Sequence, residues 1–160
     1  MSDADVLVAR MGQMQFTKSG QTLKAIMGSC VGVGLLWHKQ GKYALSHCLL
    51  GESPEGSATP NAKYVSDAIP MMLEAMGVES RRECYSIRCV VVGGSAMLQG
   101  TGTAEAEEIG RSNLEAARKH IIKNGLAITQ IEDARGNASQ LYIDGATGEY
   151  EINIIPKLVV

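Results

Sequence analysis

Residues 30–48 read CVGVGLLWHKQGKYALSHC, and this stretch decides the fold. Between Val31 and Trp37 every second residue is a large apolar one, with two glycines in between, and this period of two is typical of a β-strand. Residues 38–41 end in glycine and are typical of a tight turn, and a second strand-like stretch runs over 43–50. The sequence therefore predicts a β-hairpin.

The register of this hairpin decides which side chains share a face. If Trp37 pairs with Lys42, Cys30 lies opposite Leu49, and His47 lies on the same face as Cys30, one diagonal away. Cys48 then points to the other face. A shift of one residue would separate Cys30 from His47, so the prediction depends on the turn.

Two glycines follow Cys30 on its own face of the strand. Side chains at positions 30, 32 and 34 point the same way, and Gly32 and Gly34 have none. We therefore expect a nearly bare face on which the Cys30 thiol is open to a substrate.

A thiol beside an imidazole is the arrangement of an activated cysteine nucleophile. The imidazolium stabilises the thiolate, and the histidine later acts as acid and base. This chemistry makes Cys30 and His47 the candidate catalytic pair. Of the other histidines, we expect His38 in the exposed turn and His120 at the surface or boundary of a helix.

The remaining cysteines are Cys48, Cys84 and Cys89. Their spacing lacks the paired C-x₂-C ligands of a zinc site, so no metal is predicted. We expect them to be reduced, inert and buried.

The rest of the chain predicts further strands and two helices. The expected strands lie at 22–29, 86–92, 126–131, 141–143 and 150–155, and the expected helices at 61–76 and 105–124. Strands do not alternate strictly with helices. We therefore expect an α/β fold of the α+β-like sandwich kind, with a mixed or antiparallel sheet and two main helices.

Several local features refine this outline. Asn61 is the expected cap of the first helix, and Pro70 should kink or break it. Residues 51–60 are rich in proline and glycine and indicate a mobile surface loop. Arg81 and Arg82 are expected in a solvated turn. Gly93-Gly94 lacks the spacing of a dinucleotide site and indicates a tight turn or a close backbone approach, so no cofactor is predicted.

Length and charge exclude other classes of protein. The chain has 160 residues, 45% of them hydrophobic, and a formal net charge of −2. It is therefore not a strongly basic nucleic-acid binder, and it has no apolar run near the roughly 18 residues of a membrane span. The acidic N-terminus does not resemble a signal peptide. We expect one domain over 1–160, cytoplasmic, with no nucleic-acid partner and no membrane insertion.

Motifs in the hairpin and beyond it resemble a known family. Gly28-Ser29-Cys30-Val31-Gly32-Val33, Ser46-His47-Cys48-Leu49-Leu50, Val91-Val92-Gly93-Gly94-Ser95 and Ile109-Gly110-Arg111-Ser112-Asn113 occur in the order seen in the CheD family, the chemoreceptor glutamine deamidases of bacterial chemotaxis. The resemblance implies a fold similar to the catalytic domains of the deamidating cytotoxic necrotizing factor toxins. It also implies a cysteine deamidase without a cofactor, with Cys30 as nucleophile and His47 as its partner. The implied substrates are glutamines on the cytoplasmic helices of chemoreceptors, and the implied partner is CheC, a phosphatase.

One departure from the family concerns the third catalytic group. The family usually has a threonine six residues before the catalytic cysteine, where this chain has Lys24, so Thr22 is the candidate in its place. The toxin relatives orient the histidine with a backbone carbonyl instead. Backbone N–H groups at Ser29 and Cys30 are the candidate oxyanion donors.

Two alternatives remain open. A diverged chain of this family could be a binding module that keeps the receptor or CheC-type interface and has lost turnover. A small thiol peptidase would use the same Cys–His pair, but nothing in the sequence specifies a peptide groove.

Overall fold

The computed structural model describes residues 5–54, 59–93 and 104–156, and over 104–109 it describes the backbone alone. The strands form two sheets. The four-stranded sheet has the order β1-β3-β8-β9, and its strands are Val6–Val8, Thr22–Met27, Ala138–Asp144 and Tyr150–Ile155, respectively. The five-stranded sheet has the order β2-β5-β4-β6-β7, and its strands are Met14–Thr17, Lys42–Cys48, Val31–Trp37, Arg88–Gly93 and Ala127–Asp133, respectively.

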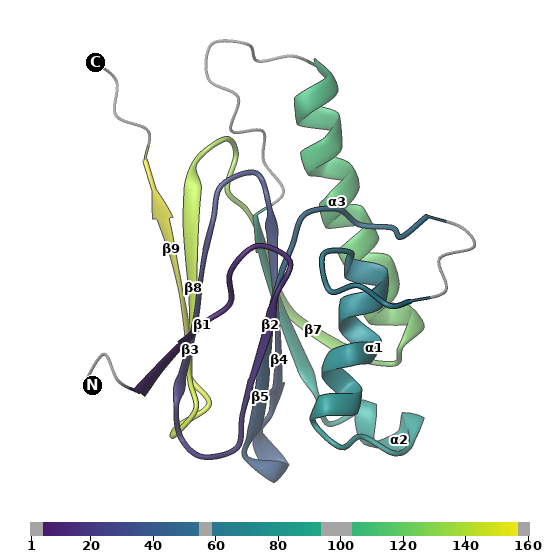
Figure 1. The fold of residues 1–160 in the computed structure, drawn as a ribbon, viewed down its shortest axis with the longest axis vertical. Coiled ribbons are helices and arrows are strands. Elements are labelled where there is room, and N and C mark those ends of the chain that lie inside the picture. The colour runs from purple at the N-terminus through teal and green to yellow at the C-terminus, as the bar shows by residue number, and fades with distance from the viewer. Residues whose placement is uncertain (1–4, 55–58, 94–103, 157–160) are drawn as a thin grey trace.

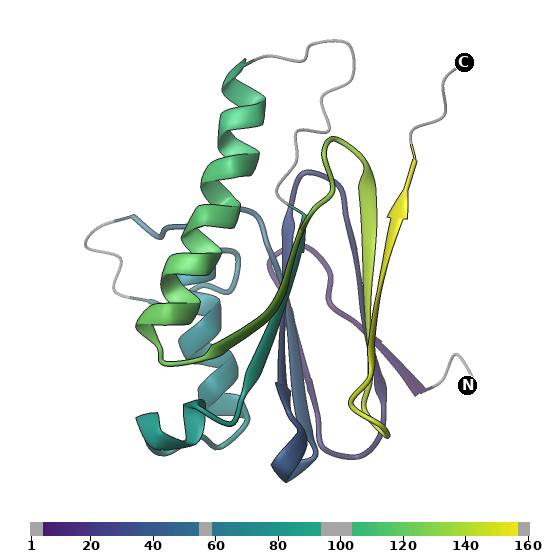
Figure 2. The ribbon, with the colours of Figure 1, turned by 180° about the vertical axis from the view of Figure 1, so that it is seen from behind.

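The helices form a third layer. α1 (Val65–Ala75), α2 (Arg81–Cys84) and α3 (Ala104–Lys123) lie on one face of the five-stranded sheet, and the four-stranded sheet lies on the other (Figures 1 and 2). Each sheet contains one parallel pair, β1 with β3 and β6 with β7, and is otherwise antiparallel. The predicted mixed sandwich with two main helices is confirmed, with α2 as an addition.

Strand β4 separates two apolar cores. Val31, Val33, Leu35 and Trp37 pack toward the helices, whereas Leu36 packs into the layer between the two sheets. Every residue of β4 is buried because the strand is covered on both faces. We call the apolar region between the sheets the inter-sheet layer.

The glycines of β4 do not form a bare face, so that prediction is wrong. A Cβ atom on Gly32 would lie 2.9 Å from Cε of Met27, and one on Gly34 would lie 2.9 Å from Cδ1 of Ile143. Because glycine has no side chain, the four-stranded sheet packs directly against the β4 backbone. The alternation was identified correctly, but the glycine face is filled.

The first helix begins later than predicted, and it is not broken at Pro70. It begins at Val65, because Asn61 caps the preceding turn through a bond from the Lys63 N–H to Oδ1 of Asn61 (3.0 Å). It runs on through Pro70, which is exposed. The predicted stop at Gly77 is confirmed by its left-handed φ of 78°.

Two strands and one helix were not predicted. β1 and β2 are short, and together they carry only seven residues. α2 occupies the place of the expected turn at Arg81, and the N–H of Ser80 bonds to Oε1 of Glu83 (3.1 Å), which is half of a capping box.

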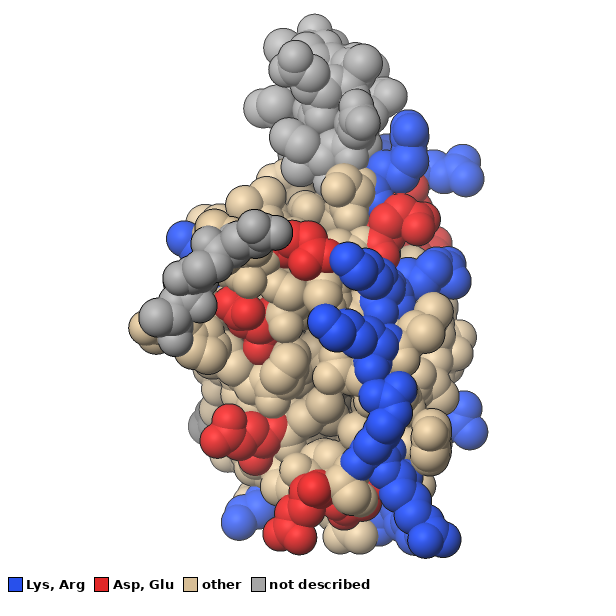
Figure 3. Space-filling model, turned by 90° about the vertical axis from the view of Figure 1, so that its right-hand side faces the viewer, with Lys and Arg blue, Asp and Glu red and all other residues tan. Residues whose placement is uncertain are grey.

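Helix α3 gives the helical face of the molecule its charge. Its solvent-exposed positions include Arg111, Arg118, Lys119 and Lys123. Figure 3 shows Lys and Arg side chains as a continuous band down this face, although the chain as a whole has a net charge of −2. None of the helices in the described residues is long and apolar enough to cross a membrane.

Gly93 confirms the predicted close approach of two backbones, while Gly94 lies outside the described residues. Gly93 pairs with Val31, has a φ of 125°, and lies so close to Cys30 that a Cβ atom would collide with the Cys30 carbonyl oxygen. We expect Gly93→Ala to lower the free energy of unfolding by about 3 kcal/mol, because it adds a collision to an unfavourable φ. Denaturant unfolding measures this loss.

Gly41→Ala is the matched control. Gly41 also has a positive φ, 63°, but a Cβ atom there meets nothing within 4 Å. This variant should lose only about 1 kcal/mol. Equal losses in the two variants would contradict the close approach at Cys30.

Candidate active site

The hairpin has the predicted register. Trp37 pairs with Lys42 and Gly32 pairs with His47. Cys30 comes directly before β4 and belongs to the inter-sheet layer, whereas Cys48 belongs to the core under the helices. Cys30 and His47 are 7% and 5% exposed, so both residues are buried.

The connection between β1 and β2 holds His47 through three hydrogen bonds. The Gly12 N–H donates to the His47 carbonyl oxygen (2.8 Å), and the His47 N–H donates to the Gln13 carbonyl oxygen (2.9 Å). In the ring, Nδ1 lies 3.1 Å from the Ala9 carbonyl oxygen. Ala9 is itself held to the four-stranded sheet by a bond from its N–H to the Lys24 carbonyl oxygen (2.8 Å). The same short segment therefore fixes both the backbone and the side chain of His47.

The Ala9 bond determines the tautomer of His47. A carbonyl oxygen can only accept a hydrogen bond, so Nδ1 carries the proton and Nε2 of the neutral ring is bare. Nε2 is buried and has no hydrogen-bond partner. Buried polar atoms without partners are rare in folded proteins, so Nε2 of His47 is a candidate for a functional role.

Burial favours the uncharged forms of the two groups. It lowers the pKa of His47 below its ordinary value of 6.5, an effect that the Ala9 carbonyl partly opposes, and it raises the pKa of the Cys30 thiol above 9.0. No hydrogen bond joins the two side chains in the described part of the chain. The resting pair is therefore thiol and imidazole, in place of the thiolate and imidazolium that the sequence predicted.

The other three cysteines are buried free thiols, as expected. Burial raises the pKa of Cys48 to about 12, and its Sγ lies 3.3 Å from the Ala62 carbonyl oxygen. Burial also raises the pKa values of Cys84 and Cys89. None of the three faces His47 from the inter-sheet layer.

The structure does not bring Thr22 to His47. Thr22 stands at the start of β3, where it lines a hollow together with Tyr142 and Asp144, while its neighbour Leu23 points into the inter-sheet layer. Nδ1 of His47 already has Ala9 as its partner. The observed partner of Nδ1 is thus a backbone carbonyl, which the side-chain pattern could not reveal.

Lys24 and Ser29 differ in their relation to the pair. The Lys24 ammonium lies 5.5 Å from the centre of the Tyr142 ring, and only the Lys24 backbone reaches toward the site, through Ala9. Ser29 is exposed in the bend 28–30, directly before Cys30. This position leaves its proposed oxyanion role as a prediction.

The segment after β5 is fastened to α3. The Gly51 N–H donates to Oδ1 of Asn113 (3.1 Å), and Oε1 of Glu52 lies 2.9 Å from Nε2 of His120 and 3.2 Å from Nζ of Lys119. His120 was expected at the surface or boundary of the helix; it is buried, and its ring bonds to the exposed carboxylate of Glu52. The expected mobile loop at 51–60 includes 55–58, which lie outside the described residues.

His38 and one further hollow lie at the far end of the sheets. His38 is exposed as predicted, and its Nε2 lies 3.0 Å from the Gly148 carbonyl oxygen.

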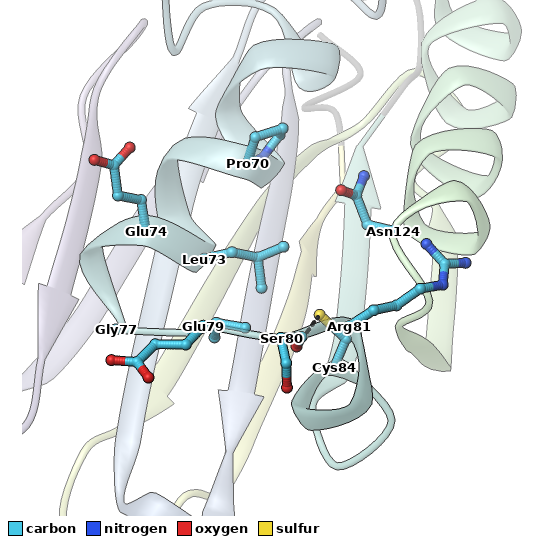
Figure 4. Close-up of a pocket in the computed structure, with 10 residues that line it drawn as sticks. Pro70, Leu73, Glu74, Gly77, Glu79, Ser80, Arg81, Cys84 and Asn124 are labelled. Atoms are coloured by element: carbon cyan, nitrogen blue, oxygen red, sulfur yellow. Dashed lines mark hydrogen bonds between the residues drawn. The ribbon is translucent and has the colours of Figure 1, made fainter.

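The hollow, between α1 and α2, has a volume of about 530 Å³ (Figure 4). Leu73 and Cys84 line it, but neither Cys30 nor His47 does. It is therefore separate from the candidate active site.

Comparison with known proteins identifies relatives over most of the chain. A family model described as "CheD chemotactic sensory transduction" matches residues 49–154. A probable chemoreceptor glutamine deamidase CheD from Bdellovibrio bacteriovorus is 35% identical over 148 residues, which cover 92% of this chain and 94% of that protein. A probable chemoreceptor glutamine deamidase CheD 2 from a Ruegeria species is 32% identical over 168 residues, which cover 95% of this chain and 93% of that protein.

Among solved structures, the chain is similar to the hypothetical protein YfiH of Bacillus licheniformis. The TM-score is 0.45 and the sequence identity 14%, and the match covers 75% of this chain and 49% of the other.

The state of His47 can be tested directly by ¹⁵N NMR. We expect a ring with the proton on Nδ1 at pH 7.5 and a pKa below 6.5, because burial disfavours the imidazolium. The native state then binds fewer protons than the unfolded state just below pH 6.5. This contribution to stability is therefore complete above 6.5 and is lost as the pH falls through the native pKa.

The resonance is assigned by its absence in His47→Gln. A proton on Nε2 at pH 7.5, or a pKa above 6.5, would show that the Ala9 carbonyl and burial do not control this ring.

Proposed function

The chain belongs to the CheD family, and from this premise we propose that it is a protein-glutamine deamidase that converts glutamines of chemoreceptors to glutamate. The observation that carries the chemistry is the buried Nε2 of His47, bare and without a partner, on the face of the hairpin that also carries Cys30. A deamidase of this kind needs a nucleophile and one group that both accepts and donates protons.

The proposed first half-reaction releases ammonia. The Cys30 sulfur attacks the carbonyl carbon of the glutamine side chain while Nε2 of His47 takes the thiol proton. Backbone N–H groups at Ser29 and Cys30 hold the oxyanion of the tetrahedral intermediate. His47 then returns the proton to the departing nitrogen, the C–N bond breaks, and a thioester remains on Cys30.

The second half-reaction releases glutamate. Nε2 of His47 takes a proton from water, and the hydroxide attacks the thioester carbon. The C–S bond breaks and the sulfur regains its proton from His47. One water has been consumed for each ammonia released, and the enzyme is restored.

The starting state of the pair is part of this proposal. Because burial favours a neutral thiol and a neutral imidazole near pH 7, His47 takes the thiol proton as the substrate carbon is attacked. The bond to Ala9 becomes stronger when His47 is charged, since the imidazolium is a better donor to a carbonyl. This carbonyl therefore supplies the orientation that a threonine supplies elsewhere in the family.

The alternatives receive less support. A weakened binding module was suggested by Lys24, but the Lys24 ammonium lies over the Tyr142 ring and the orienting bond comes from Ala9. A peptidase must admit a main chain to its thiol. A cysteine that is only 7% exposed favours a slender side-chain amide over a peptide bond.

The proposed cellular location and binding partners are based on the family. We propose that residues 1–160 act as one deamidase domain in the cytoplasm, on the cytoplasmic helices of chemoreceptors. A CheC-type phosphatase is the proposed regulatory partner.

The reaction is tested by incubating receptor with the chain and measuring both ammonia release and the mass change at each glutamine. Cys30→Ala should lower the rate by ~10³-fold or more, because it removes the nucleophile. Cys48→Ala is the matched control, since Cys48 lies on the opposite face of the same hairpin. Turnover by Cys30→Ala at the rate of Cys48→Ala would exclude Cys30 as the nucleophile, and receptor cleavage in place of deamidation would identify a peptidase.

A further inference from the structure

Two buried side-chain atoms in the described part of the chain have no hydrogen-bond partner. One is Nε2 of His47, which the proposed reaction uses. The other is the hydroxyl oxygen of Ser139, which is fully buried. A buried hydroxyl without a partner lowers stability, because it has lost its hydrogen bonds to water and gained none. Its presence therefore calls for a role outside folding.

Ser139 lies at the same end of the inter-sheet layer as the catalytic pair. Ser139 on β8 pairs with Met27 on β3. It lies two residues before Leu141, so both side chains point to the same face of β8, the face toward the inter-sheet layer. Met27 packs against Gly32, and Gly32 pairs with His47. Ser139, Met27, Gly32 and His47 thus follow one another as neighbours at this end of the layer.

The reaction creates a need for a donor at this place. When His47 takes the thiol proton, the Cys30 sulfur becomes an anion. The other residues of the inter-sheet layer, such as Met27 and Val92, are apolar. A buried anion is strongly disfavoured unless a hydrogen-bond donor meets it. Ser46, the neighbouring buried serine, cannot serve, since its hydroxyl already bonds to the Val33 carbonyl oxygen (3.4 Å).

We propose that Ser139 is a positioning residue whose hydroxyl donates a hydrogen bond to the Cys30 sulfur as the thiolate forms. This inference rests on the proposed role of Cys30 as the nucleophile. A hydroxyl that has no partner in the resting state can rotate toward the new charge without breaking another bond.

The titratable surroundings of Cys30 are few. On β5, His47 faces the inter-sheet layer at the same end and Tyr43 faces it near the other end of the strand. Cys48, on the opposite face of β5, interacts electrostatically with Cys30. The described residues that β3, β6 and β8 contribute to the layer are apolar apart from Ser139. On β7, the carboxylate-bearing Glu132 pairs with Val92 of this layer, and its Oε2 accepts a hydrogen bond from the Gln130 amide (3.3 Å).

The test compares Ser139→Ala with Ser46→Ala. Both variants remove one hydroxyl from a fully buried serine, but only Ser46 has a partner in the resting protein. The rate of Cys30 alkylation by iodoacetamide is followed against pH by peptide-level mass spectrometry, and stability is followed by denaturant unfolding. Alkylation needs no receptor, so the result does not depend on whether the chain deamidates.

For Ser139→Ala we expect the pH midpoint of Cys30 alkylation to rise by about one unit, which is about tenfold less thiolate at a given pH below the midpoint. Its stability should be equal to that of the wild type or higher. Ser46→Ala should keep the wild-type midpoint and lose stability. An unchanged midpoint in Ser139→Ala, or the same shift in both variants, would overturn the proposal.

Discussion

The hydrogen bond from Nδ1 of His47 to the Ala9 carbonyl oxygen is the constraint on which the site depends. It joins the two sheets, since Ala9 bonds to β3 of one sheet and His47 belongs to β5 of the other. It also fixes the ring so that Nε2 is bare. The sheets must therefore pack closely at this point, which the glycines of β4 allow.

Close packing explains why the pair is uncharged at rest. A layer dry enough to form a core between two sheets disfavours both thiolate and imidazolium, and the shifted pKa values of Cys30 and His47 follow from burial. Without substrate, this arrangement does not lower the stability of the protein through a buried charge, because both groups are neutral. In the proposed mechanism, the site becomes reactive when a substrate carbon accepts electrons from the sulfur as the proton leaves.

The hairpin could be predicted because its evidence is local. The alternation from Val31 to Trp37 and the glycine at position 41 determine both strands and their turn, and the register then separates Cys30 from Cys48. Short-range periodicity is a strong signal where one strand directly follows another. The two main helices were predicted for the same reason.

The remaining features depend on contacts between distant segments. Any residue can supply a carbonyl, so the role of Ala9 leaves no trace in its side chain. Strands β1 and β2 are too short to show a period. A glycine face looks the same in sequence whether solvent or Met27 covers it. The covering of His120 by Glu52 is likewise a matter of tertiary contact.

The central claim is that the Cys30 sulfur forms a covalent bond to the glutamine side chain of the substrate. Acid quenching of the chain during turnover with receptor, followed by peptide mapping under conditions that preserve thioesters, tests it most directly. The account predicts a receptor peptide joined to Cys30 through a former glutamine. An adduct on Cys48, Cys84 or Cys89, or continued deamidation with no adduct at any cysteine, would contradict it.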